Sequence, residues 1–349
     1  MTGVESDLPA CPQCGGTGGE GHIDISDRLF GAAGRWRLLF CRDARCGLWW
    51  LDPAPNTDEL MAAYQTYYTH QGTGEASRIP LRSLLRWLKH GYYARKFGYF
   101  PGQTSFWQRT LGLGLHLAPD VATDLDYGVF GLPLQPGGRL LEVGCGAGTA
   151  LQRLAELGWT VTGLDFDERA VAAARGRGLN VELGDLVDRS FPGECFDAVV
   201  TSHVIEHVPD PAAFVAECLR VLRPGGLMVH ITPNAGGWGH RLFGKNWRGL
   251  EPPRHLHIFT RAALARLVVT AGFAGVDCQT TGRGREVLRQ SLLLRNPGLG
   301  DSRQGGTLAG LAAQALAVSA RLRRPWDPEA GEELVVTAGR PRFEGEGHD

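Results

Sequence analysis

The sequence predicts an α/β protein with a doubly wound, mostly parallel sheet, preceded by a small cysteine-rich module. Three observations lead to this prediction. Short apolar runs alternate with helical segments from residue 136 onward. A glycine-rich turn follows the first of these runs, and four of the eight cysteines fall within the first 46 residues.

The apolar runs are short, continuous and bounded by turn residues, as is typical of buried parallel strands. They are Arg139–Val143, Thr160–Leu164, Ala198–Thr201 and Leu227–Ile231. The helical segments between them are Thr149–Leu157, Glu168–Arg175 and Pro211–Leu222. This alternation predicts helices on both faces of the sheet. Two further helical stretches, near 285–295 and 307–323, precede a last strand at Glu332–Ala338.

Three regions follow from these patterns. Residues 8–50 form a zinc-ribbon-like module, residues 55–130 a helical, aromatic-rich lid or linker, and residues 136–340 the α/β domain, with a helical insertion near 285–325. Within the second region, Leu81–Phe100 mixes basic with aromatic and aliphatic residues. Such a helix could lie on a membrane surface. We expect instead a lid over a substrate cleft, with its lysines and arginines solvated.

Composition and charge narrow the class of protein. A net charge of −1 gives no global basic field, so no nucleic-acid partner is expected. The first residues resemble no signal peptide, and no apolar run approaches the roughly 18 residues of a membrane span. We therefore expect a soluble, cytoplasmic protein, for which peripheral membrane contact stays open.

The N-terminal cysteines have the spacing of a metal site. Cys11 and Cys14 form a tight knuckle followed by Gly15, and Cys41 and Cys46 supply a second, looser pair. Four thiolates predict a closed tetrahedral site for structural zinc. Four unrelated thiols are one alternative. A redox Cys-x-x-Cys is another, but no thioredoxin-like βαβ unit surrounds the pair.

The most informative stretch is Leu140-Leu-Glu-Val-Gly-Cys-Gly-Ala-Gly-Thr149. Its glycines let the backbone approach a ligand closely, and helix-start amides would face that ligand. Asp165 closes the next strand, where a carboxylate can accept hydrogen bonds from both hydroxyls of a ribose. A dinucleotide fingerprint would need a glycine or alanine where Thr149 stands. The acid before the turn, Glu142, suits a ligand with a cationic end.

The chain resembles the class I S-adenosylmethionine-dependent methyltransferases over roughly residues 136–340. The resemblance rests on Glu142-x-Gly-x-Gly-x-Gly148, Asp165, Gly184-Asp185 and Leu222-Arg-Pro-Gly-Gly226, in this order. It implies a Rossmann-like sheet of seven strands with an antiparallel last strand. It also implies S-adenosyl-L-methionine as cofactor, held by Glu142, Gly144, Cys145, Gly146, Gly148, Asp165, Phe166, Asp185, Leu186 and Thr201. Among these, Asp185 would lie near the adenine amine, and Phe166 and Leu186 near its faces.

A second motif, His203-Val-Ile-Glu206-His207, follows the fourth predicted strand. The inverted zinc-peptidase motif has this form, but it needs a helix, and Pro209 and Pro211 leave too little room for one. The motif most resembles the Glu-x-x-Glu-His-Val-Pro pattern of the ubiquinone-pathway O-methyltransferases. Some relatives of those enzymes bind a divalent ion there. His203 replaces the first glutamate, which suits a softer ion or a general base.

Methyl transfer to a hydroxyl requires alignment of the acceptor and removal of its proton. An imidazole can take that proton near neutral pH. His203 is the first candidate for the catalytic base and His207 the second; His207 could equally be structural. We expect Glu206 to contact the substrate.

A third cluster, Trp247-Arg-Gly-Leu-Glu-Pro-Pro-Arg254-His255-Leu-His257, follows the fifth strand. It resembles an active-site loop of bacterial methyltransferases that carry an N-terminal cysteine module. Arg254 and His255 could therefore hold an anionic or hydroxylated substrate. A rigid proline loop with structural histidines is the alternative. Thr260 is expected to cap a helix that begins at Arg261.

The predicted function is methyl transfer from S-adenosylmethionine to a small-molecule or glycan acceptor, at oxygen. Carbon methylation of a nucleotide-linked sugar or natural-product intermediate is the main alternative. An RNA methyltransferase is disfavoured by the absence of a basic stripe. A catalytically silent scaffold whose zinc module binds a partner is disfavoured by the intact glycines, Asp165 and His203.

Overall fold

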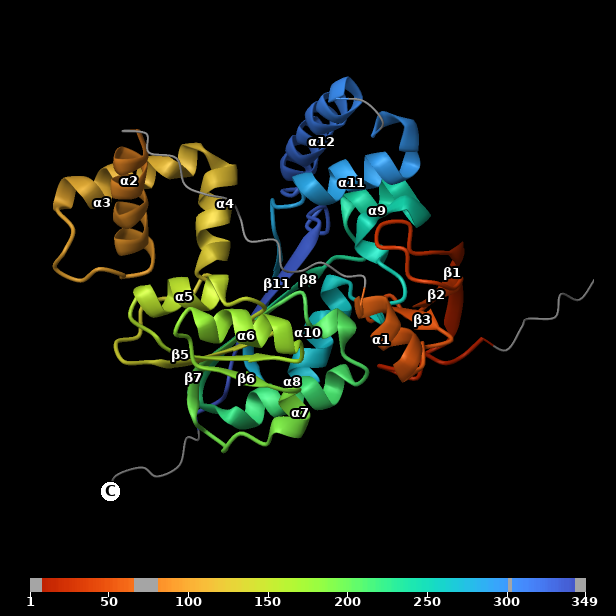
Figure 1. Ribbon diagram of the computed structural model, residues 1–349, viewed down its shortest axis with the longest axis horizontal. Helices are drawn as coiled ribbons and strands as arrows, with labels where there is room; N and C mark the ends of the chain where they lie inside the picture. The colour runs from red at the N-terminus through yellow and green to blue at the C-terminus, as the bar shows by residue number, and fades with distance from the viewer. Residues whose placement is uncertain (1–7, 66–80, 301–302, 343–349) are drawn as a thin grey trace, which may run out of the picture. The chain divides into compact units, whose positions relative to one another are not determined.

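The computed structural model describes residues 8–65, 81–300 and 303–342. The chain forms two compact units. Unit one comprises Met1–Tyr67, Ser202–Leu219 and His230–Pro341, and unit two comprises Tyr68–Thr201, Arg220–Val229 and Arg342–Asp349. Residues 8–50 lie wholly in unit one, whereas the two units divide the predicted regions 55–130 and 136–340. The predicted boundaries remain predictions. Figure 1 labels the elements along the chain.

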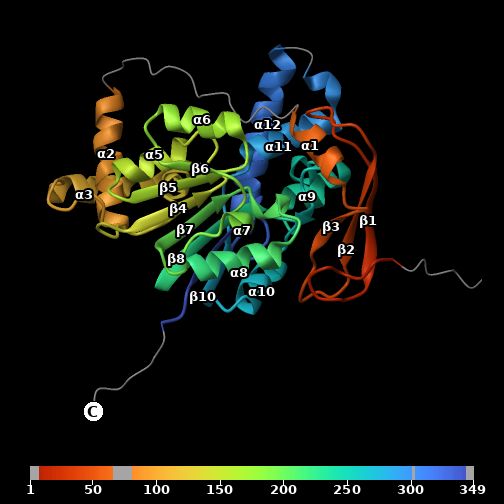
Figure 2. The same cartoon turned by 60° about the horizontal axis from the view of Figure 1, so that its bottom comes forward.

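The large sheet has seven strands in the order β10-β11-β8-β7-β4-β5-β6 (Figure 2). The strands are β4 Arg139–Val143, β5 Thr160–Asp165, β6 Val181–Leu183, β7 Phe196–Ser202, β8 Leu222–Pro233, β10 Ala274–Thr280 and β11 Glu333–Gly339. Strand β4 runs parallel to β5 and β7, whereas β10 and β11 pair antiparallel. The predicted fold class, a mostly parallel sheet of seven strands, is confirmed.

Unit two contains two sets of helices. One set connects the strands β4, β5, β6 and β7, and the other precedes β4 in the sequence. The first set is α5 Thr149–Glu156, α6 Glu168–Gly176 and α7 Leu186–Arg189. The second is α2 Leu81–Lys96, α3 Phe106–Gly112, η1 Leu113–Leu117 and α4 Pro119–Gly128. Glycines allow α2 and α3 to cross closely, because a Cβ on Gly91 would lie 2.0 Å from the carbonyl oxygen of Gln108. The helix predicted over Leu81–Phe100 ends at Lys96.

Unit one contains a four-stranded sheet in the order β1-β2-β3-β9. Its strands are β1 Gly18–Ile25, β2 Trp36–Cys41, β3 Trp49–Asp52 and β9 His257–Ile258. The short strand β9 pairs antiparallel with β3, with Trp49 opposite Ile258. The cysteine module therefore gains a strand from a segment about 200 residues later in the sequence.

The core of unit one joins the N-terminal strands to the C-terminal helices. Buried side chains of one cluster come from β1 to β3, the 235–258 segment and two helices: Ile25, Trp36, Leu38, Leu51, Phe243, Trp247, Ile258, Leu288 and Ala313. The helices of this unit are α1 Thr57–Gln65, α8 Pro211–Val221, α9 Trp238–Phe243, α10 Arg261–Thr270, α11 Arg285–Arg295 and α12 Arg303–Arg323, with α8 reaching into unit two. Thr260 caps α10, as predicted, by accepting the backbone N–H of Ala263. None of the described helices is both long and apolar enough to cross a bilayer.

Candidate functional site

The glycine turn lies in unit two, between β4 and α5. Gly144, Gly146 and Gly148 all have φ between 52° and 77°, the left-handed region that favours glycine. A Cβ on Gly148 would clash with the side chain of Leu179 at 2.4 Å, whereas one on Gly146 would meet no described atom within 4 Å. Open space therefore lies beside the middle glycine, where a ligand can approach the backbone.

Two carboxylates flank this turn. Asp165 accepts the backbone N–H groups of Gly146 at 2.7 Å and Asp167 at 2.9 Å, so its carboxylate lies directly beside the glycine turn. Glu142 is buried, and its Oε2 has no hydrogen-bond partner among the described residues. Burial, together with the neighbouring Asp165, raises the pKa of Glu142 to about 8. A buried acceptor without a partner is costly unless a ligand supplies one, so Glu142 fits the cationic end of S-adenosylmethionine.

The remaining residues predicted to bind the cofactor differ in how exposed they are. The ring of Phe166 is exposed, as an adenine contact requires, while Cys145, Leu186 and Thr201 are buried. Asp185 caps α7 by accepting the backbone N–H of Val187 at 2.8 Å. A carboxylate engaged as a helix cap and a leucine packed inside do not favour the adenine contacts predicted for Asp185 and Leu186, which stay predictions.

The four N-terminal cysteines come together in unit one. Cys11 Sγ lies 3.8 Å from Cys46 Sγ, and Cys14 Sγ lies 3.5 Å from Cys41 Sγ. All four sulfur atoms lie within 4.8 Å of one another. A zinc ion with four Zn–S bonds of about 2.3 Å places its sulfurs about 3.8 Å apart, so this group fits a tetrahedral zinc site.

His203 directly follows β7 and has an unusual backbone. Its φ of 54° is left-handed, a conformation that non-glycine residues adopt at functional sites more often than elsewhere. Its Nδ1 lies 3.2 Å from Glu206 Oε1 and its Nε2 lies 3.3 Å from Glu333 Oε1. Burial lowers the pKa of His203, but the two carboxylates outweigh this effect and raise it well above the usual 6.5. A protonated ring cannot accept a proton, so the predicted role of His203 as general base is not favoured and stays a prediction.

His207 presents a different ring nitrogen to its surroundings. Its Nδ1 lies 3.0 Å from both the Tyr64 hydroxyl and the carbonyl oxygen of Arg254. A carbonyl oxygen only accepts hydrogen bonds, so Nδ1 carries a proton and donates it. In the neutral ring the free lone pair therefore belongs to Nε2.

His255 repeats this arrangement beside His207. Its Nδ1 lies 2.8 Å from the carbonyl oxygen of Gly249, so Nδ1 again donates and Nε2 keeps the lone pair. Burial lowers the pKa of His255 to about 4, which keeps the ring neutral at physiological pH. The rings of His207 and His255 meet edge to face, with centroids 4.8 Å apart.

Glu206 completes a group of three ligand atoms. One ligand atom each from Glu206, His207 and His255 lie within 4.8 Å of one another. The Glu206 carboxylate is fully buried and accepts the hydroxyl hydrogen of Thr232 at 2.9 Å. Two imidazoles and one carboxylate suit a divalent transition metal, so these residues could hold one.

Arg254, predicted to bind substrate, is fully buried. Its guanidinium donates to the carbonyl oxygen of Ala63 at 2.9 Å, to Glu251 at 3.1 Å and to Asp27. Three protein acceptors surround this cation, so the structure favours a role in holding the N-terminal segments against the 248–258 loop. Substrate contact by Arg254 and His255 stays a prediction.

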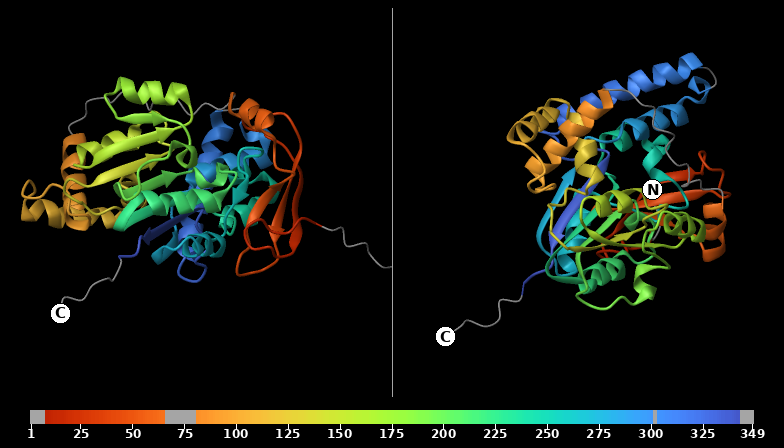
Figure 3. Two further views of the ribbon diagram at one scale, coloured as in Figure 1. Left: turned by 90° about the horizontal axis from the view of Figure 1, so that it is seen from below. Right: turned by 60° about the vertical axis from the view of Figure 1, so that its left-hand side comes forward.

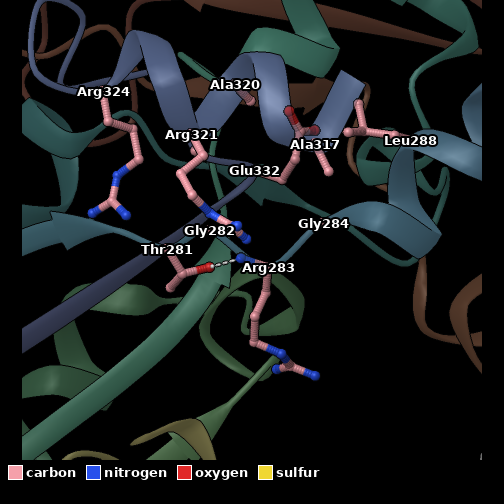
Figure 4. Close-up of a pocket in the computed structure, with 11 residues that line it drawn as sticks. Thr281, Gly282, Arg283, Gly284, Leu288, Ala317, Ala320, Arg321, Arg324 and Glu332 are labelled. Carbon is pink, nitrogen blue, oxygen red and sulfur yellow. Dashed lines mark hydrogen bonds between the residues drawn. The ribbon is translucent and has the colours of Figure 1, made fainter. Parts of the chain in front are cut away.

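Figure 4 shows a small hollow in unit one between the end of β10, the start of α11 and α12. Arg321 and Arg324 reach into view from the end of α12, and Arg283 contributes from the loop after β10. The Arg283 guanidinium lies 3.9 Å from Glu333, the carboxylate that also contacts His203. Three arginines and one acidic residue, Glu332, line the hollow, so its lining is net basic, and Arg283 adjoins the pair formed by His203 and Glu333.

The sequence analysis assigned no role to five residues around His203, Glu206, His207 and Arg254. They are Asp27, Tyr64, Thr232, Glu251 and Glu333. Each comes from a separate segment, and each contacts His203, Glu206, His207 or Arg254. Glu251 lies in the cluster Trp247–His257 and Tyr64 lies in the aromatic-rich region 55–130. Only these two therefore belong to stretches that the sequence pattern marks. Asp27, Thr232 and Glu333 stand in no motif.

Known proteins and one family model match parts of this chain. The model of a family described as a methyltransferase domain matches residues 121–277. A probable S-adenosylmethionine-dependent methyltransferase of Mycolicibacterium smegmatis is 35% identical over 195 residues, which cover 55% of this chain and 68% of the relative. A ubiquinone biosynthesis O-methyltransferase of Thiobacillus denitrificans is 36% identical over 150 residues, covering 39% of this chain and 64% of that protein.

One solved structure aligns with part of this chain. The S-adenosylmethionine-dependent methyltransferase from Mesorhizobium loti aligns with a TM-score of 0.44 and 22% identity, covering 63% of this chain and 99% of its own. The range matched by the family model includes both the glycine turn and the histidine motif of this chain. The chain belongs to the S-adenosylmethionine-dependent methyltransferases.

Proposed function

We propose that this methyltransferase acts on a hydroxyl oxygen of a small-molecule or sugar acceptor, and that His207 takes the acceptor's proton. The observation that carries the proposal is the hydrogen-bonding of His207. Because its Nδ1 faces a carbonyl oxygen at 3.0 Å, its Nε2 holds the lone pair that a general base needs. His203, held between two carboxylates, would then supply a fixed positive charge beside the acceptor.

S-adenosylmethionine, when bound, supplies an already activated methyl group. The glycine turn, Glu142 and Asp165 would hold it in unit two. The chain's remaining task is to bind the acceptor and remove its proton, which passes to His207 Nε2 as the new carbon–oxygen bond forms and the carbon–sulfur bond breaks. Oxygen is also the simplest atom to propose as methyl acceptor, because the name of the Thiobacillus denitrificans relative includes O-methyltransferase.

A divalent ion on Glu206, His207 and His255 would serve the same chemistry in another way. It would lower the pKa of a bound hydroxyl and orient it, in place of a free base. The Nε2 atoms of His207 and His255 and the buried carboxylate of Glu206 suit such an ion. Manganese is the better probe, since the cysteine site prefers zinc.

Two measurements test these proposals together. Calorimetric titration of chelator-treated protein with Mn²⁺ separates metal ligand from free base: binding that His255→Gln abolishes, with exposed His116→Gln as control, supports the ion. Incubation with ¹³C-methyl-labelled cofactor and phenolic, sugar and nucleotide-sugar acceptors identifies the methylated atom. A methoxy signal in the product supports oxygen, and a carbon-bound methyl signal refutes it.

The basic hollow favours a second candidate acceptor, a nucleotide-linked sugar. Arg283, Arg321 and Arg324 offer guanidinium groups that pair well with phosphate. Arg321→Gln and Arg324→Gln would then raise the KM for a nucleotide-linked sugar by about tenfold each and leave that for a neutral phenol unchanged. Equal effects on both acceptors would exclude this candidate.

We also propose that Cys11, Cys14, Cys41 and Cys46 hold a structural zinc ion. Elemental analysis should find one tightly bound zinc per chain, lost in Cys11→Ser and Cys41→Ser but kept in Cys195→Ser, whose thiol lies outside the cluster. Since metal binding contributes folding free energy directly, the two ligand variants should also lower the Tm. Unchanged zinc content and Tm would contradict the assignment.

A further inference from the structure

We propose that residues 83–117, on α2, α3 and η1, form a surface that docks on an anionic lipid bilayer. We call these residues the helical surface. They carry five basic residues (Arg86, Lys89, Arg95, Lys96 and Arg109), of which Lys96 pairs with Asp126 of α4, and no aspartate or glutamate of their own. The whole chain, in contrast, is balanced, with 36 basic and 37 acidic residues. A positive region in a neutral protein marks a site for a negatively charged partner.

The same residues expose large apolar side chains. Seven of the 20 exposed large hydrophobic residues among the described positions lie here: Leu84, Leu85, Phe106, Trp107, Leu111, Leu113 and Leu117. Phe106 is 72% exposed, Trp107 68% and Leu117 91%. Exposed apolar side chains concentrated in one group of helices indicate an interaction site.

The packing of α2 on α3 keeps these side chains outside. Helix α3 contacts α2 through Gln108, whose side chain donates to the carbonyl oxygen of Trp87 at 2.9 Å, and through Gly112, which lies against Tyr92. Trp107 and Leu111 lie one turn apart, away from that contact. The rings of Phe106 and Trp107 meet at 5.4 Å.

The interior of these helices is complete without the exposed residues. Tyr92, Tyr93 and Tyr99 are buried, and their hydroxyls donate to Asp126 and to the carbonyl oxygens of Leu125 and Leu132. Figure 3 shows α2 and α3 standing together in orange and yellow. Phe106, Trp107 and Leu117 therefore add nothing to this core, which leaves them available for a partner.

A lipid surface explains both properties of the helical surface. Aromatic and leucine side chains insert at the boundary between headgroups and acyl chains, while lysine and arginine attract anionic headgroups. Nucleic acid would account for the charge and the exposed aromatic rings but not for the exposed leucines, and a second copy of the chain would account for the apolar side chains but not for the charge. The proposal is independent of which acceptor is methylated.

Flotation of the full chain with lipid vesicles tests the proposal. We expect binding to phosphatidylcholine vesicles that contain phosphatidylserine and much weaker binding to phosphatidylcholine alone, with a decrease at high salt. Trp107→Ala should weaken binding about tenfold, and Lys89→Glu about fivefold for each unit of charge changed. The matched control is Trp326→Ala, which removes an 85% exposed tryptophan from unit one.

Three results would overturn the proposal. The first is vesicle binding that neither Trp107→Ala nor Lys89→Glu weakens. The second is a dimer of the wild-type chain in ultracentrifugation that Trp107→Ala dissociates, which would assign the surface to a second copy. The third is tight binding to single-stranded RNA without binding to vesicles. Binding of S-adenosylhomocysteine, unchanged in each variant, confirms that the variants are folded.

Discussion

The glycine turn of unit two is built from one continuous stretch of chain, whereas the cluster around His207 in unit one is assembled from segments scattered along the sequence. The turn depends on backbone conformation, with three glycines at positive φ between β4 and α5. The cluster depends on side chains that meet only after folding, including Tyr64, Glu206, His255 and Glu333. We therefore expect substitutions far away in the sequence to disturb the assembled site more than the local one.

The largest expected effect concerns the assembled site. His207→Gln should lower turnover by about 10²–10⁴-fold, since it removes the nitrogen that accepts the proton. Affinity for S-adenosylhomocysteine, held by the local site, should stay near the wild-type value. His116→Gln is the matched control, and steady-state kinetics with calorimetry provide both readouts. Wild-type turnover in His207→Gln would exclude this histidine from catalysis.

The next effect tests whether the cluster needs its distant supports. Arg254→Met should destabilise unit one by about 3–5 kcal/mol, because Asp27 would keep a buried charge without its arginine and Glu251 would keep only Arg248 as an arginine partner. The 87% exposed Arg45 offers a control, since Arg45→Met should cost less than about 1 kcal/mol. Urea unfolding of both variants measures the difference. Equal stabilities would mean that the buried arginine is dispensable.

A smaller effect is expected at the local site. Asp165→Ala should weaken S-adenosylhomocysteine binding by about 2–3 kcal/mol, the value of charge-assisted hydrogen bonds to two hydroxyls. Asp185→Ala removes a carboxylate that caps α7 and should weaken binding less. Calorimetry compares the two directly. If Asp185→Ala has the larger effect, the predicted adenine contact of Asp185 holds and the cap is secondary.

The smallest effect depends on pH. In the free protein the folded state holds the Glu142 proton up to a pKa of about 8, above the usual 4.5. The unfolded state loses that proton first, so this group reduces stability as pH rises from 4.5 to about 8. Glu142→Gln should therefore raise the Tm relative to wild type by a few degrees near pH 8, and by nothing near pH 4, while weakening cofactor binding. Parallel Tm profiles for the two proteins would contradict this.

The sequence predicted most of the local features because they leave periodic or spaced signals. The run Arg139–Val143, the helix that begins at Thr149 and the helix cap at Thr260 all appear where expected. The pairing of β9 with β3 was not foreseen, because a two-residue strand has no pattern of its own. The role of His203 was equally hard to judge, since Glu333, which helps to raise its pKa, lies 130 residues away.

Strand β9 limits how this protein can be divided into fragments. Its Ile258 packs in the same core as Ile25, Trp36 and Leu38 of the N-terminal strands. A fragment that begins after residue 120 would leave β9 without its pairing strand and expose that apolar surface, which invites aggregation. We therefore expect the cysteine module to be exchangeable between methyltransferases only together with the segment that contains His257 and Ile258.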